Sequence, residues 1–418
     1  MGMENLTSMA GFFSFCLFAW LLSSSRRKIN WRPVIGGIIL QFMLAAFLFC
    51  VPAFRGLFLV FSDIFTNLLE FSREGIIFVF GELGKKDSPQ GMILAFQVFP
   101  FIIVFSSLMA FLHYIKVIPS VVKFLARIIS STLRTSGAES LCAASNIFAG
   151  IESATAVRPY IKDMTDSELF LILVTGMSTV ASSVMALYVS FLSDTFPAIA
   201  GHLISASMIS IPASFVIAKL MVPETSVPLT ANVQSCEVSP ELEAKSATES
   251  LVSGADAGYK LAVGVAVTLI AFIGILGIVQ GIAAHVTGQE RIIQKLLAYI
   301  FYPLAFLTGV SASDVPAAAD MLGKRVILTE IPAYLDLAAF SRAGGNPRTV
   351  LIISYALCGF SHIASMAIFV GGIGALAPSK ISTLSKLGVR ALIGSTLVTL
   401  MTGAVAGIFY WGQSGLIK

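Results

Sequence analysis

The sequence predicts an all-α polytopic membrane protein with about eight transmembrane helices. Of its 418 residues, 56% are hydrophobic and 12% are charged, which is about half the charged fraction of a soluble globular chain. A helix needs roughly 20 apolar residues to cross a hydrocarbon core of about 30 Å. Eight charge-free stretches approach or exceed that length: 6–22, 33–54, 92–115, 169–192, 196–217, 261–282, 350–376 and 391–411.

The composition also excludes several classes of protein, namely a disordered chain, a disulfide scaffold and an ordinary soluble enzyme. The five cysteines are widely spaced, with no CxxC pair and no cluster with histidine, so neither disulfides nor a zinc site is expected. No stretch matches GxxxxGKS/T, GxSxG or HExxH, which argues against ATP-driven transport and against a hydrolase. The net charge of +4 is slight and forms no basic stripe, so nucleic acid is not an expected partner.

The basic residues predict the orientation of the chain. Arg26, Arg27, Lys28 and Arg32 follow the first apolar stretch, and short loops rich in Lys and Arg stay in the cytoplasm. With eight crossings, both termini are expected outside, in a multi-pass protein of the cell inner membrane. Charges at helical spacing in 55–80 predict a helix that lies along the bilayer surface.

One acidic segment, 222–256, divides the chain into two halves. It carries six acidic residues, one lysine and three prolines. Such a stretch buries too little apolar surface to fold alone, and its composition is typical of a solvated linker. We therefore expect a cytoplasmic linker between two membrane-embedded halves.

Each half contains an apolar region that is too polar to face lipid. These regions are 136–160 and 303–334, rich in Ala, Gly and Ser and interrupted by charged residues. Each has about the length of two half-depth helices, and each precedes a long apolar span with polar interruptions and then a second span. Broken segments at corresponding places in two halves indicate a transporter whose site lies where they meet.

Four residues within these regions and spans are candidates for chemistry. Glu152 and Glu330 are ionisable groups at membrane depth, where such groups are usually functional or paired. The alternative is that each carboxylate only neutralises a nearby base, Arg158 for the first and Lys324 or Arg325 for the second. Hydroxyls in membrane helices mostly bond to their own helix, and Thr179 is the exception we favour. His362 lies mid-span among polar neighbours, and a role as ligand or as helix–helix partner remains open.

Several strings resemble the concentrative nucleoside transporters of the shorter, bacterial type. They are ASNIFAGIE at 144–152, VRPY at 157–160, MTDSELF at 164–170, FYPLAFLTGV at 301–310, Glu330 with AY at 333–334, and ALCGF at 356–360. The similarity runs from the first apolar stretch to Gly407, which is essentially the whole chain.

The resemblance implies a sodium-coupled symporter that imports nucleosides by alternating access. Family members are homotrimers, and each protomer has a scaffold and a transport domain built from two re-entrant hairpins and broken helices. The expected divisions are scaffold spans and interfacial helices (1–135), the first hairpin with two spans (136–221), the linker (222–256), a scaffold span (257–295), and the second hairpin with two spans (296–418).

The resemblance also implies roles for individual residues. Sodium would meet the Asn146 side chain, the Ala149 and Val180 carbonyls and the Thr179 hydroxyl. Uncharged oxygen ligands of this kind suit a weakly held monovalent cation. The nucleobase would contact Ile151, Glu152 and Val184. The ribose would contact Glu330, Phe360, His362 and Ser365. A carboxylate that accepts hydrogen bonds from sugar hydroxyls gives strong, charge-assisted recognition.

The chain departs from the family pattern at three places. The string before the nucleobase site is one residue shorter, Thr329 stands where the family usually has Asn, and Ser361-His362 replaces Ala-Asn. Because a histidine can titrate near neutral pH, proton coupling is the alternative to sodium. Two further alternatives to a standard nucleoside symporter are a transporter of non-standard nucleosides or nucleobases and a gated pore.

Overall fold

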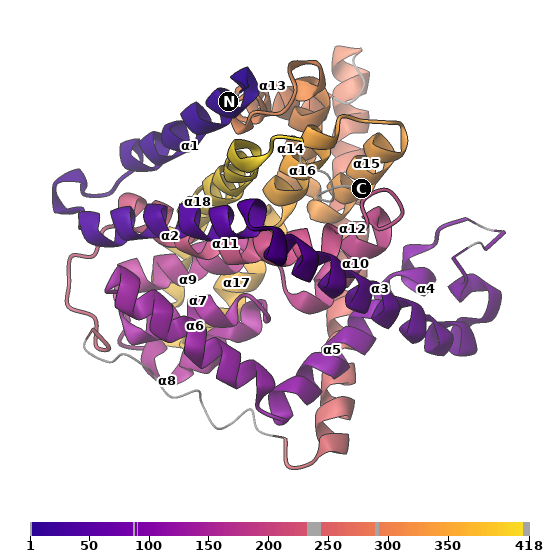
Figure 1. Ribbon diagram of the computed structural model, residues 1–418, viewed down its shortest axis with the longest axis horizontal. Helices are drawn as coiled ribbons and strands as arrows, with labels where there is room; N and C mark the ends of the chain where they lie inside the picture. Colours follow the sequence, from indigo (N-terminus) through magenta and orange to yellow (C-terminus); the bar gives the residue numbers. More distant parts are fainter. Residues whose placement is uncertain (1, 87, 90, 232–243, 289–291, 413–418) are drawn as a thin grey trace.

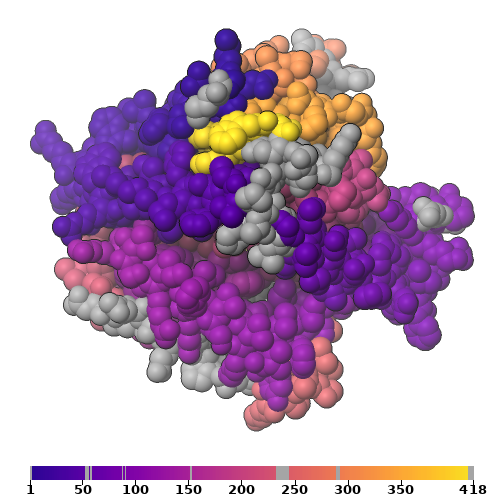
Figure 2. Space-filling model, viewed as in Figure 1, coloured from indigo at the N-terminus to yellow at the C-terminus, as the bar shows by residue number. Residues whose placement is uncertain are grey.

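The computed structural model describes residues 2–86, 88–89, 91–231, 244–288 and 292–412, with the side chains of 52–55, 57–58 and 151–152 left out of the description. All regular elements in these ranges are α or 3-10 helices, which confirms the predicted fold class. On the face shown in Figure 2, the indigo N-terminal helices lie over the middle of the molecule, and the yellow end of α18 emerges between them and the orange second half.

Six helical segments of the described chain are long and apolar enough to cross a membrane. They are α2 (Trp31–Cys50), α4 with α5 (Leu94–Gln97 and Phe99–Tyr114), α9 with α10 (Asp166–Ser178 and Ser182–Leu192), α11 (Ile199–Met221), α12 (Ala247–Thr287) and η6 with α18 (Pro378–Lys380 and Ile381–Phe409). The predicted stretch 6–22 is the helix α1 (Met3–Leu21). The predicted span 350–376 is not continuous, because it is split into α16 (Pro347–Leu357) and α17 (Ile363–Leu376).

The predicted surface helix is a single long element, α3 (Pro52–Phe80). The short 3-10 helices η1 (Arg26–Lys28) and η2 (Gly81–Gly84) precede α2 and follow α3, and α6 (Val117–Leu133) follows α5. In Figure 1, α3 continues the line of α2 and, together with α4, projects from the body of the molecule.

The predicted linker extends too far toward the C-terminus, because residues 247–256 form the first turns of α12. Ser246 caps this helix by accepting a hydrogen bond from the Glu249 amide, so an acidic residue here stabilises a helix N-terminus. A Cβ atom at Gly254 would lie 2.8 Å from the Ser106 carbonyl oxygen, and this small residue therefore lets α12 pack closely on α5. Figure 1 shows α12 beside α5 and extending past the body of the molecule.

Each half contains a helical hairpin, a broken helix and a long helix. In the first half these are α7 (Gly137–Ser145) with η3 (Ile151–Val157) and α8 (Arg158–Ile161), then α9 and α10, then α11. In the second half they are α14 (Val315–Leu328) with α15 (Glu330–Arg342), then α16 and α17, then α18. The two polar regions of the sequence therefore do form helix–turn–helix units, although the returning arm of the first begins as a 3-10 helix.

The limits expected for the second hairpin were wrong. Pro303 lies inside α13 (Ile292–Thr308), and the hairpin begins only after η5 (Ala312–Asp314) and continues to Arg342. Proline is tolerated within membrane helices when neighbouring groups satisfy the freed backbone, so its presence did not mark a boundary here. The divisions expected at 256 and 295 consequently fall inside α12 and α13.

A buried ionic cluster joins the first hairpin to α9 and α11. Ser136 and Thr165 cap α7 and α9 and form capping boxes with Glu139 and Glu168. The Ser136 hydroxyl also donates to Glu168 Oε1 at 2.7 Å, and Lys219 near the end of α11 donates to Glu139. The cluster fixes the N-terminal ends of two helices whose other ends form the candidate site.

Candidate functional site

The interruptions of the two broken helices lie against one another. The Ser361 hydroxyl, in the break between α16 and α17, donates to the Met177 carbonyl at the end of α9 at 3.0 Å. A Cβ atom at Gly359 would lie 2.9 Å from the Ser178 carbonyl carbon, so only glycine fits at this approach. Residues from both halves of the chain are thus brought together.

The tip of the first hairpin reaches the first of these breaks. The Phe148 carbonyl accepts a hydrogen bond from the Ser182 amide, the first residue of α10, at 3.2 Å. Asn146 is fully buried; its Oδ1 accepts from Ser153 Oγ at 2.9 Å, and its Nδ2 donates to the Cys142 carbonyl at 3.2 Å. Of the predicted ion ligands, Ala149 directly follows this tip.

The other two predicted ion ligands lie in the break itself. Thr179 ends α9 with an extended backbone (φ −123°, ψ 168°), and Val180 follows it; both are buried. The Thr179 hydroxyl donates to the Thr175 carbonyl at 3.0 Å, which leaves its lone pairs available. Thr175 Oγ1, one turn earlier, is buried and has no hydrogen-bond partner among the described residues.

These groups offer uncharged oxygens, of which those of Asn146, Thr179 and Val180 belong to buried residues and that of Ala149 to a half-buried one. Amide, hydroxyl and carbonyl oxygens at a helix break suit a monovalent cation. In the described part of the chain, no three His, Cys, Asp or Glu side chains gather in a way that could hold a metal ion. The donor set therefore fits sodium better than it fits zinc or another transition metal.

Glu330 begins α15 at the tip of the second hairpin and its carboxylate is buried. Oε1 accepts a hydrogen bond from Tyr188 at 2.7 Å, and Oε2 lies 3.1 Å from His362 Nε2. The preceding residue, Thr329, has φ of +104°, a conformation that is costly for a side chain with a branched Cβ. The hairpin thus holds a strained tip immediately beside the carboxylate.

The two bases proposed as alternative partners of Glu330 bond elsewhere. Lys324 lies 2.7 Å from Asp320 and 2.8 Å from Asp336. Arg325 is fully buried and donates to the Ala356 carbonyl and, at 2.9 Å, to Thr399 Oγ1. Within the described residues, the side chains bonded or paired to Glu330 are Tyr188 and His362, from α10 and from the second break.

His362 is the N-cap of α17. Its Nδ1 accepts a hydrogen bond from the Ser365 amide at 3.1 Å, so this nitrogen carries no proton and, in the tautomer that the network assigns, the proton is on Nε2. Nε2 therefore presents N–H to Glu330. Ser365 Oγ shares its one proton between the carbonyls of His362 and Phe360. The Phe360 ring stands at 89° to the His362 ring, with ring centroids 6.3 Å apart.

Three residues expected on the nucleobase side are only partly placed. Ile151 and Glu152 lie at the start of η3, but their side chains fall outside the described residues. Val184 is buried in the first turn of α10. Tyr188, one turn further along, was not singled out from the sequence because an aromatic ring in an apolar span is typical of packing; its four-residue spacing from Val184 was the only available signal.

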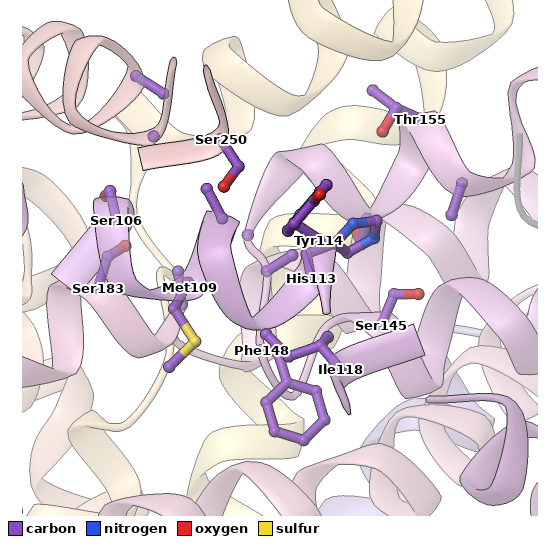
Figure 3. A pocket seen from close by; sticks show the side chains of 18 of the residues that line it. Ser106, Met109, His113, Tyr114, Ile118, Ser145, Phe148, Thr155, Ser183 and Ser250 are labelled. Atoms are coloured by element: carbon purple, nitrogen blue, oxygen red, sulfur yellow. The ribbon is translucent and has the colours of Figure 1, made fainter. Parts of the chain in front are cut away.

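A cavity of about 340 Å³ opens beside the first hairpin, a volume within the range of small-molecule sites. The hairpin and the first break contribute Ala149, Gly150 and Ser183, and α5, α6 and α12 line the opposite side. Figure 3 shows His113 and Tyr114 of α5 next to one another, with Ser145, Phe148 and Thr155 of the hairpin around them. Of the predicted site residues whose side chains the structure describes, Ala149 is the one that lines this cavity.

Comparison with known proteins identifies the family. Residues 202–407 match the family described as "Na+ dependent nucleoside transporter C-terminus", 10–83 match the corresponding N-terminus, and 95–195 match "Nucleoside recognition". The nucleoside permease NupC of Helicobacter pylori is 32% identical over 97% of this chain and 98% of its own. The chain belongs to the concentrative nucleoside transporter family.

Other relatives and a solved structure agree with this assignment. An uncharacterized transporter of Haemophilus influenzae is 37% identical over 97% of this chain and 98% of its own. The mouse sodium/nucleoside cotransporter 1 is 32% identical over 97% of this chain and 64% of its own length. The structure of CNTnw in an inward-facing, substrate-bound state superposes with a TM-score of 0.90 at 34% identity, covering 98% of this chain and 100% of that one.

The family and the fold together establish a membrane transporter rather than an enzyme. A structure of CNTnw with two substitutions, in an outward-facing state, also superposes, with a TM-score of 0.87. The chain therefore shares its architecture with a nucleoside transporter that has been observed open to either side.

Proposed function

We propose that this transporter imports nucleosides across the inner membrane together with sodium, by alternating access. The proposal rests on two chemically different sets of groups, one at the first helix break and one at the tip of the second hairpin. The first break offers buried neutral oxygens, and the second hairpin presents a buried carboxylate that is hydrogen-bonded to Tyr188 and lies next to His362. One set has the chemistry for a monovalent cation and the other has the chemistry for sugar hydroxyls.

Sodium would be held by four groups at the first hairpin and the first break. Asn146 Oδ1 and Thr179 Oγ1 each keep a lone pair after the bonds described above. Ala149 follows Asn146 by three residues and Val180 directly follows Thr179, and their carbonyls would complete the set. The names of the mammalian relatives, sodium/nucleoside cotransporters, support the choice of ion. Bound sodium would supply a positive charge that orders the tip of the hairpin against the break.

The nucleoside would lie between the two hairpins. Glu330 and Ser365 would contact ribose hydroxyls, with Phe360 and His362 beside the sugar. Ile151, Glu152 and Val184 would face the nucleobase.

The test is uptake into proteoliposomes that contain the purified full-length transporter. Labelled uridine and adenosine would be offered under an inward sodium gradient, under choline in place of sodium, and under an inward proton gradient without sodium. We expect saturable uptake that collapses when sodium is replaced. Uptake driven by protons alone would establish the alternative coupling ion, and unsaturable flux would indicate a pore.

The ion site predicts a defined defect in sodium dependence. Asn146→Ala and Thr179→Val each remove one oxygen ligand, at a cost of about 1–3 kcal/mol for an unmade polar contact. The sodium concentration for half-maximal uptake should rise accordingly. Thr396→Val is the matched control, because Thr396 also donates to its own helix, at 2.8 Å to the Leu392 carbonyl, and is none of the proposed ligands. Unaltered sodium dependence in both site variants would refute these ligands.

Two substitutions at His362 separate its capping role from its contact with Glu330. Asparagine is a good N-cap and leucine is not, whereas both remove the Nε2–H that faces Glu330. His362→Asn should therefore melt close to wild type and His362→Leu should lose about 1 kcal/mol of stability, while both bind nucleoside more weakly. Thermal melting and calorimetric titration measure the two effects. Wild-type affinity in both variants would remove His362 from the substrate site.

We further propose that the transporter is a homotrimer with both termini outside. The most hydrophobic 18-residue window of α12 is only 17% buried within one chain, against 89% for that of α11, so α12 has apolar surface for lipid and for neighbouring copies. Native mass spectrometry in lipid nanodiscs measures the oligomeric state. Accessibility of a cysteine introduced at Gly2 to an impermeant reagent on whole cells measures the orientation.

A further inference from the structure

One oxygen of the Glu330 carboxylate is held by a residue from the other half of the chain. Tyr188, in α10, donates its hydroxyl proton to Glu330 Oε1 at 2.7 Å, and both side chains are buried. Hydrogen bonds to an ionised acceptor are shorter and roughly twice as strong as those between neutral groups. The bond therefore constrains where the carboxylate lies and how it is rotated.

Tyr188 is itself rigidly placed. Its ring stacks on that of Tyr334, with centroids 4.2 Å apart and planes at 13°. Tyr334 lies one turn after Glu330 in α15, and its hydroxyl donates to the Ser354 carbonyl in α16 at 2.9 Å. Tyr188, on α10, is thus held by its contacts with α15, and the Tyr334 ring on which it stacks is fixed in turn by α16.

The two carboxylate oxygens consequently differ in what they can offer. Oε1 is engaged by Tyr188. Oε2 lies near His362 Nε2, yet it makes no well-aligned hydrogen bond to any described residue. A buried acceptor without a full complement of donors is costly unless a ligand or water supplies one. Oε2 is therefore the oxygen left to accept from a hydroxyl group of a ligand.

We propose that Tyr188 is a positioning residue that sets discrimination between ribonucleosides and deoxynucleosides. By holding Oε1, Tyr188 turns Oε2 toward the sugar. A ribose hydroxyl at this place donates a strong hydrogen bond to Oε2, whereas a deoxy sugar leaves Oε2 without a donor. Discrimination against a substrate that lacks such a partner is characteristically large. The inference rests on the proposed contact between Glu330 and ribose.

The test compares Tyr188→Phe with Tyr355→Phe in the purified full-length transporter at saturating sodium. Both variants remove one buried tyrosine hydroxyl, but that of Tyr355 lies 2.9 Å from His202 Nδ1 rather than at Glu330. Calorimetry would give Kd for the better bound of uridine and adenosine and for its 2′-deoxy and 3′-deoxy analogues. The ratio of deoxy to ribo Kd is the readout, because a purely structural defect weakens all ligands alike.

We expect Tyr188→Phe to weaken ribonucleoside binding about tenfold, which is the effect of losing one hydrogen bond to a charged group. Of the two Kd ratios, 2′-deoxy to ribo and 3′-deoxy to ribo, the larger should fall toward one. Tyr355→Phe should leave both ratios unchanged. A Tyr188→Phe protein with unchanged or larger ratios, or with equal losses for every ligand, overturns the proposal. Since phenylalanine keeps the stacked ring, the Tyr188→Phe protein should still fold. If it no longer binds nucleoside, Tyr188→His, which offers a ring N–H donor, should recover part of the discrimination.

A double-mutant cycle distinguishes failure of this inference from failure of the proposed function. If Glu330→Gln retains deoxy discrimination, the carboxylate does not read ribose and the proposed substrate contact is wrong. If Glu330→Gln loses discrimination while Tyr188→Phe keeps it, the contact stands and only the positioning role falls. In the Glu330→Gln background, adding Tyr188→Phe should change the ratios no further, because coupled residues are not additive.

Discussion

Replacing Glu330 by glutamine is expected to lower nucleoside affinity about 10- to 100-fold and to abolish most uptake. The substitution keeps the shape of the side chain but removes the charge, and hydrogen bonds to charged groups contribute about 1.5–3 kcal/mol each. It also replaces the carboxylate oxygen that faces His362 Nε2 by an amide group, whose N–H can point at the N–H of that ring. Initial rates of labelled uridine and adenosine uptake, with competition by 2′-deoxy and 3′-deoxy analogues, measure the loss.

The matched control for this change is Asp336→Asn in the same helix. Asp336 lies at 2.8 Å from Lys324, which keeps Asp320 as a partner, and it is far more exposed than Glu330. Removing its charge should alter uptake little. If Glu330→Gln transports and still discriminates against deoxy analogues, the ribose contact is not made by Glu330.

Replacing Lys219 by methionine should have the largest effect on stability, about 3–5 kcal/mol, the cost of removing one partner from a buried ion pair. The Lys219 ammonium donates to Glu139 and, at 3.0 Å, to the Ser167 hydroxyl. Without it, Glu139 is left as a buried charge close to Glu168, since Ser136 bonds to both carboxylates. Thermal melting in detergent measures the loss.

Lys260→Met is the corresponding exposed change. Lys260 pairs with Asp256 one turn away on α12, and both side chains are largely exposed, so the pair should contribute at most about 1 kcal/mol. A Lys219→Met protein that melts like Lys260→Met would show that the cluster at the N-terminal ends of α7 and α9 does not determine stability.

The fold class was predictable because burial in a bilayer leaves a strong compositional signal. The two hairpins were visible as regions too polar for lipid, since Glu139 and Arg325 stand within otherwise apolar runs. Boundaries were harder to predict, because hydropathy is averaged over many residues and a break of five residues between α16 and α17 hardly changes that average. Likewise, the acidic start of α12 resembled a linker until its packing on α5 was known.

The candidate site was predictable only where polarity singled out a residue. Glu330 and His362 are conspicuous within apolar surroundings, and the resemblance supplied Asn146 and Thr179. Tyr188 was missed because its hydrogen-bond partner lies 142 positions away, and no local pattern reports such a contact. The capping role of His362 was also missed, because histidine is not among the usual N-cap residues.

The contact between the two helix breaks limits how the transporter can open. Separating Ser361 from the end of α9 would strip the buried Met177 carbonyl of its side-chain partner, which is costly where no water can replace it, and it would also open the close approach of Gly359 to Ser178. The parts proposed to hold ion and sugar should therefore travel as one rigid body. The cavity lined by the first hairpin, α5, α6 and α12 lies beside these parts, so in the alternating access proposed above they would slide along this surface while the bonds inside the site stay intact.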